Sequence, residues 1–438
     1  MSMTAVEKIL ARASGVTSVN AGEIVYPKPG IVVLHDYLVP PCKKELDALG
    51  IDRLFDPNRV IIVTDHAVLY SSRQDAEFGK IIRRAVADWG IKHFYDVGQG
   101  GHGHIFLAER GIIRPGMFLF DNDRHCTNHG AYGAFALRTG AEITRVLATG
   151  TLWTMVPKTI RIKLTGTLQP GVFARDIGLR MTTDLQFGRD YGVDIDYRVL
   201  ELTGPALSHF SMDARVSLCS SPTEARAVGV FIPPSEKMLR QIRTVAQKTF
   251  SPVYSDPDAL FEKEFEMDIG NIGPQAALTG FSDRGVDLSQ IEGTRIHHAV
   301  IGSCGSGKYE DLEIAATVLK GNRVAPGVRL FISPGTEDSA KRLYMEGLWE
   351  IFHTAGAILL PPGCGPCFMG YMAPVSEGEV SISTVSTNPL GRMGGKGCEL
   401  FLASPATVAA SAVSGRVTDP RSIDALIKNK GESDLERF

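Results

Sequence analysis

The chain has 438 residues, of which 44% are hydrophobic, so it is long enough for two or three globular domains. Its 46 Lys and Arg against 49 Asp and Glu give a formal net charge of −3, which lacks the basic excess that nucleic-acid binding requires. No apolar run approaches the roughly 20 residues of a membrane span, and seven scattered cysteines are too few for a secreted disulfide scaffold. We therefore expect a cytoplasmic enzyme that binds neither nucleic acid nor membrane.

The first part of the chain alternates short apolar runs with helical patterns. Residues 6–13 predict an amphipathic helix that ends at Gly15, and residues 75–89 predict a longer helix. Strands are predicted at 59–63, 93–97 and 116–120. This alternation is typical of an α/β domain, in which active-site residues lie in the loops at the strand ends.

Changes in the pattern divide the chain into three α/β regions, which we expect at residues 1–155, 156–285 and 286–438. The second region begins with an alternating strand at 159–164, and the third begins with an apolar strand at 295–302. The pattern of the third region then predicts a helix at 311–319, a strand at 328–333 and a helix at 338–355. The predicted fold class is therefore α/β throughout.

Three cysteines lie in loops of the third region. Cys304 directly follows the strand at 295–302, and Cys364 and Cys367 form a C-x-x-C turn among Pro and Gly residues. Because such residues let the backbone approach closely, the three thiolates could hold an inorganic cluster at the strand ends of one sheet. Three thiolates on a four-iron cluster leave one iron without a protein thiolate, and that iron can act as a Lewis acid.

Other interpretations of the same loops stay open from the residues alone. A C-x-x-C pair also suits zinc or a redox dithiol, although zinc requires further Cys or His ligands and the sequence has no second C-x-x-C. Residues 302–308 also fit the phosphate-binding pattern G-x-x-x-x-G-K. That pattern normally closes with Ser or Thr, whereas Tyr309 stands here.

A series of short phrases occurs along the chain in the order found in one enzyme family. They are Ala-Gly-Glu-Ile-Val at 21–25, Thr-Asp-His at 64–66, Ala-Thr-Gly at 148–150, Ile-Gly-Ser-Cys at 301–304, Tyr-Glu-Asp-Leu at 309–312, Gly-Cys-Gly-Pro-Cys at 363–367, Gly-Arg at 391–392 and Leu-Ala-Ser-Pro at 402–405. By these phrases the chain resembles the large subunits of 3-isopropylmalate dehydratase and homoaconitase, within the aconitase superfamily. The resemblance covers nearly the whole length and implies three α/β domains around a central 4Fe-4S cleft.

The resemblance also implies roles for individual residues. Cys304, Cys364 and Cys367 match the family's cluster ligands, and Arg392 matches the arginine that clamps a substrate carboxylate. The residues that match the polar shell handling protons and the leaving hydroxyl are Asp65, His66, His104, Asp123, His125 and Glu224. A His beside a carboxylate is the commonest proton donor near neutral pH, so the Asp65–His66 and Asp123–His125 spacings suit that task.

Two departures from the family pattern fall inside the expected site. Asp-Ser-His-Thr in the family is Asp-Arg-His-Cys here, at 123–126, and Asn-Arg-Asn-Phe is Ser-Thr-Asn-Pro, at 386–389. We hypothesise that Arg124 replaces the guanidinium lost at Thr387 and binds the substrate. The alternative is a site that accepts a smaller or less charged acid. Cys126 either packs as a buried thiol or caps the fourth iron, which would leave a structural or sensing cluster.

The expected protein is an iron-sulfur hydro-lyase that dehydrates or hydrates a small hydroxy carboxylic acid, such as an isopropylmalate-like or methylmalate-like diacid. Alternatives are a hydratase of maleate or citraconate and a non-catalytic, cluster-bearing sensor. Because the chain ends soon after 402–405, where the family's large subunit ends, the resemblance implies a separate small subunit. That partner would supply the swivelling domain with the catalytic serine and another arginine.

Overall fold

The computed structural model describes residues 2–186, 191–280 and 283–423 of the chain. The chain divides into two compact units. Unit 1 comprises residues 1–163, 187–204 and 226–266, and unit 2 comprises residues 164–186, 205–225 and 267–438. The predicted middle region, 156–285, is therefore divided between the two units, and the boundaries at 155 and 285 stay predictions. None of the helices in the described ranges combines the length and the apolar composition that crossing a bilayer requires.

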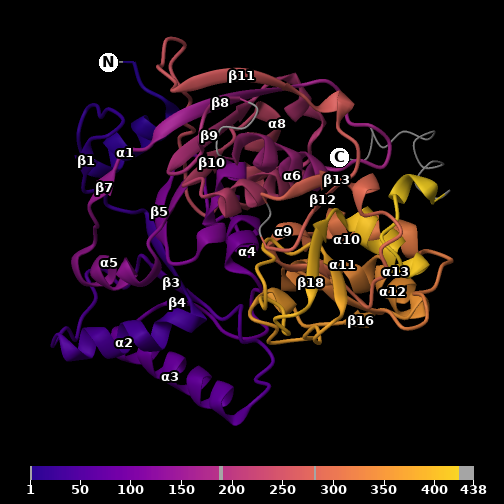
Figure 1. Ribbon diagram of the computed structural model, residues 1–438. Helices are drawn as coiled ribbons and strands as arrows, with labels where there is room; N and C mark the ends of the chain where they lie inside the picture. Colours follow the sequence, from indigo (N-terminus) through magenta and orange to yellow (C-terminus); the bar gives the residue numbers. More distant parts are fainter. Residues whose placement is uncertain (1, 187–190, 281–282, 424–438) are drawn as a thin grey trace. The chain divides into compact units, whose positions relative to one another are not determined.

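Unit 1 contains a five-stranded parallel sheet with the strand order β4-β3-β2-β5-β6 (Figure 1). Its strands are β2 (Ile31–His35), β3 (Val60–Val63), β4 (His93–Tyr95), β5 (Phe118–Asp121) and β6 (Phe135–Arg138). The accompanying helices are α1 (Ala5–Ser14), α2 (Val39–Ala48), α3 (Arg73–Trp89), α4 (Gly103–Glu109) and α5 (Ile143–Thr149). These elements confirm the α/β pattern predicted for the first part of the chain.

Local sequence signals explain where several of these elements form. Strand β3 is a continuous run of Val and Ile residues, each no more than 2% exposed, which is typical of a parallel strand buried on both faces. Helix α1 begins at a capping box in which Thr4 and Glu7 bind each other's backbone N–H groups. It ends at Gly15, whose φ of 70° lies in the left-handed region that glycine adopts most easily.

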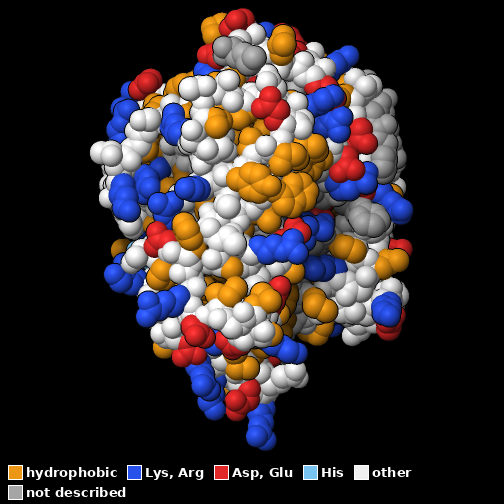
Figure 2. Space-filling model, turned by 90° about the vertical axis from the view of Figure 1, so that its left-hand side faces the viewer, with side chains coloured by type: hydrophobic (Ala, Val, Ile, Leu, Met, Phe, Trp, Pro, Cys, Tyr) orange, Lys and Arg blue, Asp and Glu red, His pale blue; other side chains and the backbone are white. Residues whose placement is uncertain are grey.

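Two smaller sheets follow. One has the order β10-β9-β8-β11, with β8 (Lys158–Thr165), β9 (Arg198–Thr203), β10 (Gly229–Phe231) and β11 (Lys263–Asp268), and α8 (Glu236–Val245) follows β10 in the chain. The other pairs β1 (Ile24–Val25) with β7 (Thr154–Met155) in antiparallel register. Ile24 lies opposite Met155 there, and both are exposed, at 52% and 38%. Figure 2 faces the side on which Figure 1 shows β1 and β7, and hydrophobic side chains gather on it.

Unit 2 is built around a seven-stranded sheet with the order β13-β12-β18-β17-β14-β15-β16. Its strands are β12 (Gln275–Ala277), β13 (Gly285–Asp287), β14 (His298–Gly302), β15 (Arg329–Ser333), β16 (Ile358–Leu359), β17 (Val380–Ser383) and β18 (Glu399–Ala403). The run from β18 to β16 is parallel, and β12 joins it antiparallel to β18. Helices α10 (Tyr309–Leu319) and α13 (Pro405–Ser414) pack against each other and against β14 (Figure 1). The other helices of the unit include α6 (Ala174–Leu185), α7 (Met212–Ser220) and α9 (Ser303–Ser306).

One helix prediction in this unit was wrong. Residues 338–355 form two helices, α11 (Glu337–Met345) and α12 (Leu348–Ala355), and not the single helix that the pattern suggested. The break falls at Gly347, whose φ of 77° cannot continue a right-handed helix. The apolar periodicity resumes after the break in a new direction, so periodicity alone did not reveal it.

Candidate active site

In unit 1, polar residues gather where the parallel strands end. His35 is the last residue of β2 and Asp36 follows it, Asp65 and His66 come just after β3, and Asp121 closes β5. Because the carboxyl ends of parallel strands meet at one edge of a sheet, these side chains lie together. Two further elements reach the same edge, namely α4, which begins at His102, and the 3₁₀ segment η2 (Arg124–Tyr132), which begins after Asp123.

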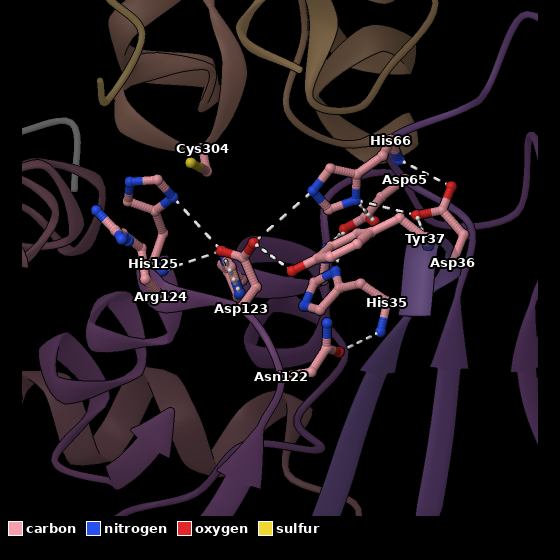
Figure 3. A network of polar contacts seen from close by, with 12 residues as sticks. His35, Asp36, Tyr37, Asp65, His66, Asn122, Asp123, Arg124, His125 and Cys304 are labelled. Atoms are coloured by element: carbon pink, nitrogen blue, oxygen red, sulfur yellow. Dashed lines mark hydrogen bonds and ion pairs between the residues drawn. The ribbon is translucent and has the colours of Figure 1, made fainter. Parts of the chain in front are cut away.

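Asp65 is the centre of the first half of this network (Figure 3). Its Oδ1 lies 2.7 Å from Nδ1 of His66, and its Oδ2 lies 2.7 Å from Nδ1 of His35. The same Oδ2 is 3.3 Å from Nδ1 of His102 and accepts a hydrogen bond of 2.9 Å from the N–H of Gly103. Asp65 is completely buried. A buried carboxylate with this many donors is firmly held in one orientation.

The negative charge of Asp65 and the positive charge of His66 stabilise each other. Burial disfavours the charge of Asp65, but His35, His66 and His102 outweigh it and hold the pKa of Asp65 well below its usual range. Burial also opposes the charge of His66, yet Asp65 and Asp36 raise the pKa of His66 to about 10. Nδ1 of His66 lies 3.0 Å from Oδ1 of Asp36, whose other oxygen accepts the N–H groups of His66 and Ala67. His66 is therefore protonated at neutral pH.

Asp121 and Asp123 form the second half of the network. Nε2 of His104 lies 3.5 Å from Oδ2 of Asp121 and 3.8 Å from Oδ1 of Asp123. Nδ1 of His125 lies 3.5 Å from Oδ1 of Asp123, whose Oδ2 accepts a hydrogen bond of 3.2 Å from the hydroxyl of Tyr37. Burial opposes the charge of Asp123, but His125 and His104 bring its pKa well below the usual value. Both carboxylates thus stay ionised beside imidazoles.

The structure joins all five site residues that the sequence predicted in unit 1, namely Asp65, His66, His104, Asp123 and His125. The sequence did not single out other members of the same network: His35, Asp36, Tyr37, His102, Asp121 and His129. A usable signal was present, because His35-Asp36 follows an apolar strand in the same way as Thr64-Asp65-His66 does. His129 has a pKa lowered to about 3 by burial and by the neighbouring His104, so it is neutral.

Arg124 and Cys126 differ sharply in exposure. Arg124 is exposed at the start of η2, beside His125 (Figure 3). Cys126 is completely buried, and burial together with Asp121 and Asp123 raises the pKa of its thiol well above the usual value. Its Sγ donates to the carbonyl oxygen of Arg124 at 3.9 Å. Burial and a contact with backbone are what a packed thiol shows, which is one of the two roles predicted for Cys126.

In unit 2, the three predicted ligand cysteines lie at one edge of the seven-stranded sheet. Cys304 lies in α9, directly after β14, while Cys364 and Cys367 flank the turn η9 (Gly365–Cys367) after β16. Strands β14, β15 and β16 are parallel neighbours, so both loops leave the same edge. All three thiols are buried and none forms a disulfide. The pKa of Cys364 is raised by a hydrogen bond with Cys367, by burial and by the negative charge of Cys304. The three sulfurs therefore interact electrostatically.

The backbone around these cysteines fits an iron-sulfur cluster. Gly302 has a φ of 139° and Gly365 a φ of 64°, and a side chain on Gly305 would approach the carbonyl oxygen of Thr384 to 2.8 Å. Ser303 adopts a φ of 65°, which costs energy for a residue with a side chain. Backbone that can approach a ligand closely, together with three sulfur donors, suits a cluster of iron and sulfide. Bound iron would also stabilise the thiolates that otherwise repel one another.

Buried cations accompany the cysteines. Arg175 on α6 is 1% exposed, donates hydrogen bonds to Oγ of Ser221 at 3.1 Å and to the carbonyl oxygen of Val385 at 2.7 Å, and interacts electrostatically with Cys304. Arg392 is half-buried in the loop between β17 and β18 and favours the thiolate form of Cys364. The positive charges would offset the negative charge of cluster and thiolates.

Lys308 does not serve as a phosphate-binding lysine. Its side chain is completely buried, and its ammonium lies 2.7 Å from Oδ2 of Asp311. It also donates to Oγ of Ser217 and to the carbonyl oxygen of Gly305. Because the ammonium of Lys308 is bound by groups inside the protein, the match to G-x-x-x-x-G-K reflects the turn after β14 and not a nucleotide site.

Glu224 and Thr387 are hydrogen-bonded to each other in unit 2. Oγ1 of Thr387 donates to Oε2 of Glu224 at 2.8 Å, and both residues are at least 93% buried, at 5% and 7% exposure. The neighbouring Ser386 lies 3.2 Å from Sγ of Cys304 and 2.9 Å from Oγ of Ser220. Glu224, which was predicted for the polar shell, therefore lies beside Thr387. The adjacent residue Ser386 contacts the predicted cluster ligand Cys304.

Comparison with known proteins decides the family. The model of the aconitase family (aconitate hydratase) matches residues 7–293 and 284–415. The chain belongs to the aconitase family. Aconitase-type enzymes are hydro-lyases, which remove and add water, and an iron-sulfur cluster is general in the family. The chain is therefore an aconitase-type hydro-lyase with an α/β fold, as the sequence predicted.

Individual relatives are similar over nearly their whole length. The 3-isopropylmalate dehydratase large subunit 1 of Methanopyrus kandleri is 40% identical over 422 residues, which covers 96% of this chain and 99% of the relative. The 3-isopropylmalate dehydratase large subunit of Halothermothrix orenii is 38% identical and covers 97% and 100%. The probable methanogen homoaconitase large subunit of Methanothermobacter thermautotrophicus is 35% identical and covers 96% and 98%.

Proposed function

We propose that this hydro-lyase reversibly dehydrates a small hydroxy diacid, isopropylmalate-like or methylmalate-like, as the large subunit of a two-subunit enzyme. The observation that carries the proposal is the pairing of buried imidazoles with ionised carboxylates at the strand ends of unit 1. Relatives named as large subunits of 3-isopropylmalate dehydratase and homoaconitase support the substrate class and the partner.

Cys304, Cys364 and Cys367 would hold a 4Fe-4S cluster. When bound, the cluster would supply a Lewis acid, because three protein thiolates leave one of its irons open. The chain's own contribution is the cradle of close backbone after β14 and β16 and the nearby cations Arg175 and Arg392.

The histidines of unit 1 would handle the protons of the reaction. His66, protonated on both ring nitrogens, directs Nδ1 toward Asp65 and Asp36 and Nε2 toward Asp123, at 3.9 Å. His104 and the pair of Asp123 and His125 would assist departure of the hydroxyl by giving it a proton. Glu224 of unit 2, hydrogen-bonded by Thr387, is the further carboxylate that would handle protons.

Arginines would bind the substrate's carboxylates. Arg392 suits this task because a guanidinium can bind a carboxylate through two parallel hydrogen bonds. Arg124 is exposed and carries the charge that the buried Thr387 lacks, so it would replace the family's second arginine. The swivelling domain, the catalytic serine and a further arginine would come from a small subunit.

A hydratase of maleate or citraconate is the second candidate. Thr387, whose hydroxyl is occupied by Glu224, departs from the family pattern at a predicted substrate position, which makes a smaller diacid the alternative substrate. A cluster-bearing sensor without catalysis is not favoured, because the polar network of unit 1 retains each proton-handling residue of the family pattern.

The experiment is an assay of water addition by the anaerobically prepared complex of this chain with a small subunit. Isopropylmaleate, dimethylmaleate, citraconate and maleate would be compared. The proposal predicts turnover of a branched diacid and little or no activity of the chain alone. Preference for maleate, which has no branch, would support the second candidate, whereas turnover of citraconate, whose hydration gives a methylmalate, would agree with the first. A complex that holds a cluster but hydrates none of these acids would refute both.

A further inference from the structure

His35 lies between the two halves of the polar network in unit 1. Its Nδ1 is 2.7 Å from Oδ2 of Asp65, and its Nε2 is 3.3 Å from Oδ1 of Asp121. All three side chains are completely buried. The backbone N–H of His35 is anchored by a hydrogen bond of 2.6 Å to Oδ1 of Asn122 (Figure 3). The backbone of His35 is thus fixed at the end of β2, and its buried ring lies between the two carboxylates.

A ring with a carboxylate at each nitrogen has only one favourable protonation state. A neutral imidazole has one N–H and one lone pair, so the lone pair would face carboxylate oxygen in a medium without water. The doubly protonated ring instead offers a donor to each oxygen and a positive charge between two negative ones. Consistent with this, burial opposes the charge but Asp65 and Asp121 raise the pKa of His35 well above the usual value.

We propose that His35 is a positioning residue, a permanent imidazolium that joins the Asp65–His66 pair to the Asp121–His104 pair and keeps both carboxylates ionised and correctly oriented. The proposal rests on the proposed function, in which His66 and His104 act on the substrate. Oδ1 of Asp65 faces His66 at 2.7 Å and Oδ2 of Asp121 faces His104 at 3.5 Å, so a displaced carboxylate would displace the imidazole that it orients.

The charged and titratable groups around His35 come from the segments after β2, β3 and β5 and from the start of α4. Its ring centroid lies 4.6 Å from that of His104, 5.4 Å from that of His66 and 5.9 Å from that of His102. Asp123 and His129 also interact electrostatically with it. Within the described part of the chain this cluster includes four carboxylates and several imidazoles, and His35 lies against both Oδ2 of Asp65 and Oδ1 of Asp121. The four carboxylates are Asp36, Asp65, Asp121 and Asp123.

Nitrogen NMR of the full chain with ¹⁵N-labelled histidine tests the protonation state directly. At pH 8.5, histidines with an ordinary pKa are neutral and show unlike ring nitrogens. The proposal predicts a histidine whose two ring nitrogens both carry protons and whose signals vanish in His35→Gln but persist in His93→Gln. His93 is exposed at the start of β4, which makes it a matched control. If the signals lost in His35→Gln are those of a neutral ring, the proposal is wrong.

Kinetics of the two-subunit complex provide the second arm. The side-chain amide of Gln in His35→Gln has one NH₂ donor and one carbonyl acceptor. The carbonyl oxygen would face the carboxylate of Asp65 or of Asp121, so that carboxylate would have to move away or become protonated. We expect kcat to fall about 10- to 100-fold with KM nearly unchanged and with a shifted pH profile, while iron content stays the same. A pH profile like that of His93→Gln would overturn the proposal. If the wild-type complex hydrates no diacid, the proposed function fails, yet the NMR result still decides the state of His35.

Discussion

Thr387 donates a hydrogen bond of 2.8 Å from Oγ1 to Oε2 of Glu224, and both side chains are buried in unit 2. The family pattern places an arginine at this position. A threonine here cannot reach a substrate carboxylate with a charge, but it holds the carboxylate of Glu224 in one orientation. Under the proposed function, the threonine at 387 would provide a contact inside the protein where the family pattern has a substrate contact.

Removal of this hydroxyl should destabilise the protein. Thr387→Val keeps the shape but removes the hydrogen bond that Oγ1 donates to the buried carboxylate of Glu224, and loss of a hydrogen bond to a charged group costs about 1.5–3 kcal/mol. Thr387→Ser keeps the hydroxyl and serves as the matched control. We expect the Tm of the valine variant to fall clearly below that of the serine variant in thermal unfolding followed by circular dichroism. Equal Tm values for the two variants would show that the hydrogen bond is unimportant.

Arg124→Ser tests the proposed carboxylate contact. The side chain is exposed, so its loss should leave folding unchanged, whereas loss of a charge-assisted pair of hydrogen bonds should raise KM for a dicarboxylate about 10- to 100-fold. Arg145→Ser is the control, because Arg145 is an exposed arginine on α5 with a 64% exposed side chain. An Arg124→Ser enzyme with wild-type affinity for the diacid would discard the hypothesis.

Strand ends and helix caps made much of the fold predictable. Val60 to Val63 is an apolar run with no polar interruption, and Gly15 ends α1, so both elements formed where expected. The break at Gly347 was missed because a glycine inside a helical pattern indicates a stop only when its backbone adopts a positive φ. That conformation depends on how α11 and α12 pack against α10, which no local pattern contains.

The candidate site was predictable only in part. Family phrases led to Asp65, His66, Asp123 and the cysteines, but His35 and Asp121 lie 86 positions apart in the sequence and meet because β2 and β5 are neighbours. Strand order is a long-range property, so the sequence alone gave no reason to pair them. The buried Arg175 was missed for the same reason, since helix α6 precedes β14 by more than a hundred positions.

The charge of His66 predicts how stability depends on pH. The folded-state pKa of about 10 exceeds the ordinary unfolded value of about 6.5, so His66 stabilises the fold fully below about pH 6.5. That contribution is lost as the pH rises through 10. We expect the Tm of the wild type to fall more steeply between pH 7 and pH 10 than that of His66→Gln. Parallel Tm curves for the two proteins over this range would contradict the assigned charge.

Arg175 should affect how firmly the cluster is held. Its buried guanidinium interacts with Cys304, so Arg175→Met would leave the thiolates less neutralised. We expect the variant to lose iron faster on exposure to a chelator under anaerobic conditions and to have a more negative reduction potential. Arg175→Lys keeps the charge and should lie between Arg175→Met and the wild type. Chelation rates and potentials that do not differ among the three proteins would exclude this role.

The most direct test of the whole account is the iron and acid-labile sulfide content of the anaerobically reconstituted chain and its cysteine variants. The account predicts about four irons and four sulfides per wild-type chain, with loss of the cluster in Cys304→Ser, Cys364→Ser and Cys367→Ser. Cys398→Ser should keep it, because the thiol of Cys398 donates to the carbonyl oxygen of Gly395, a bond that serine can also make. A wild-type chain that binds zinc alone, or a triad variant with full iron content, would contradict the account.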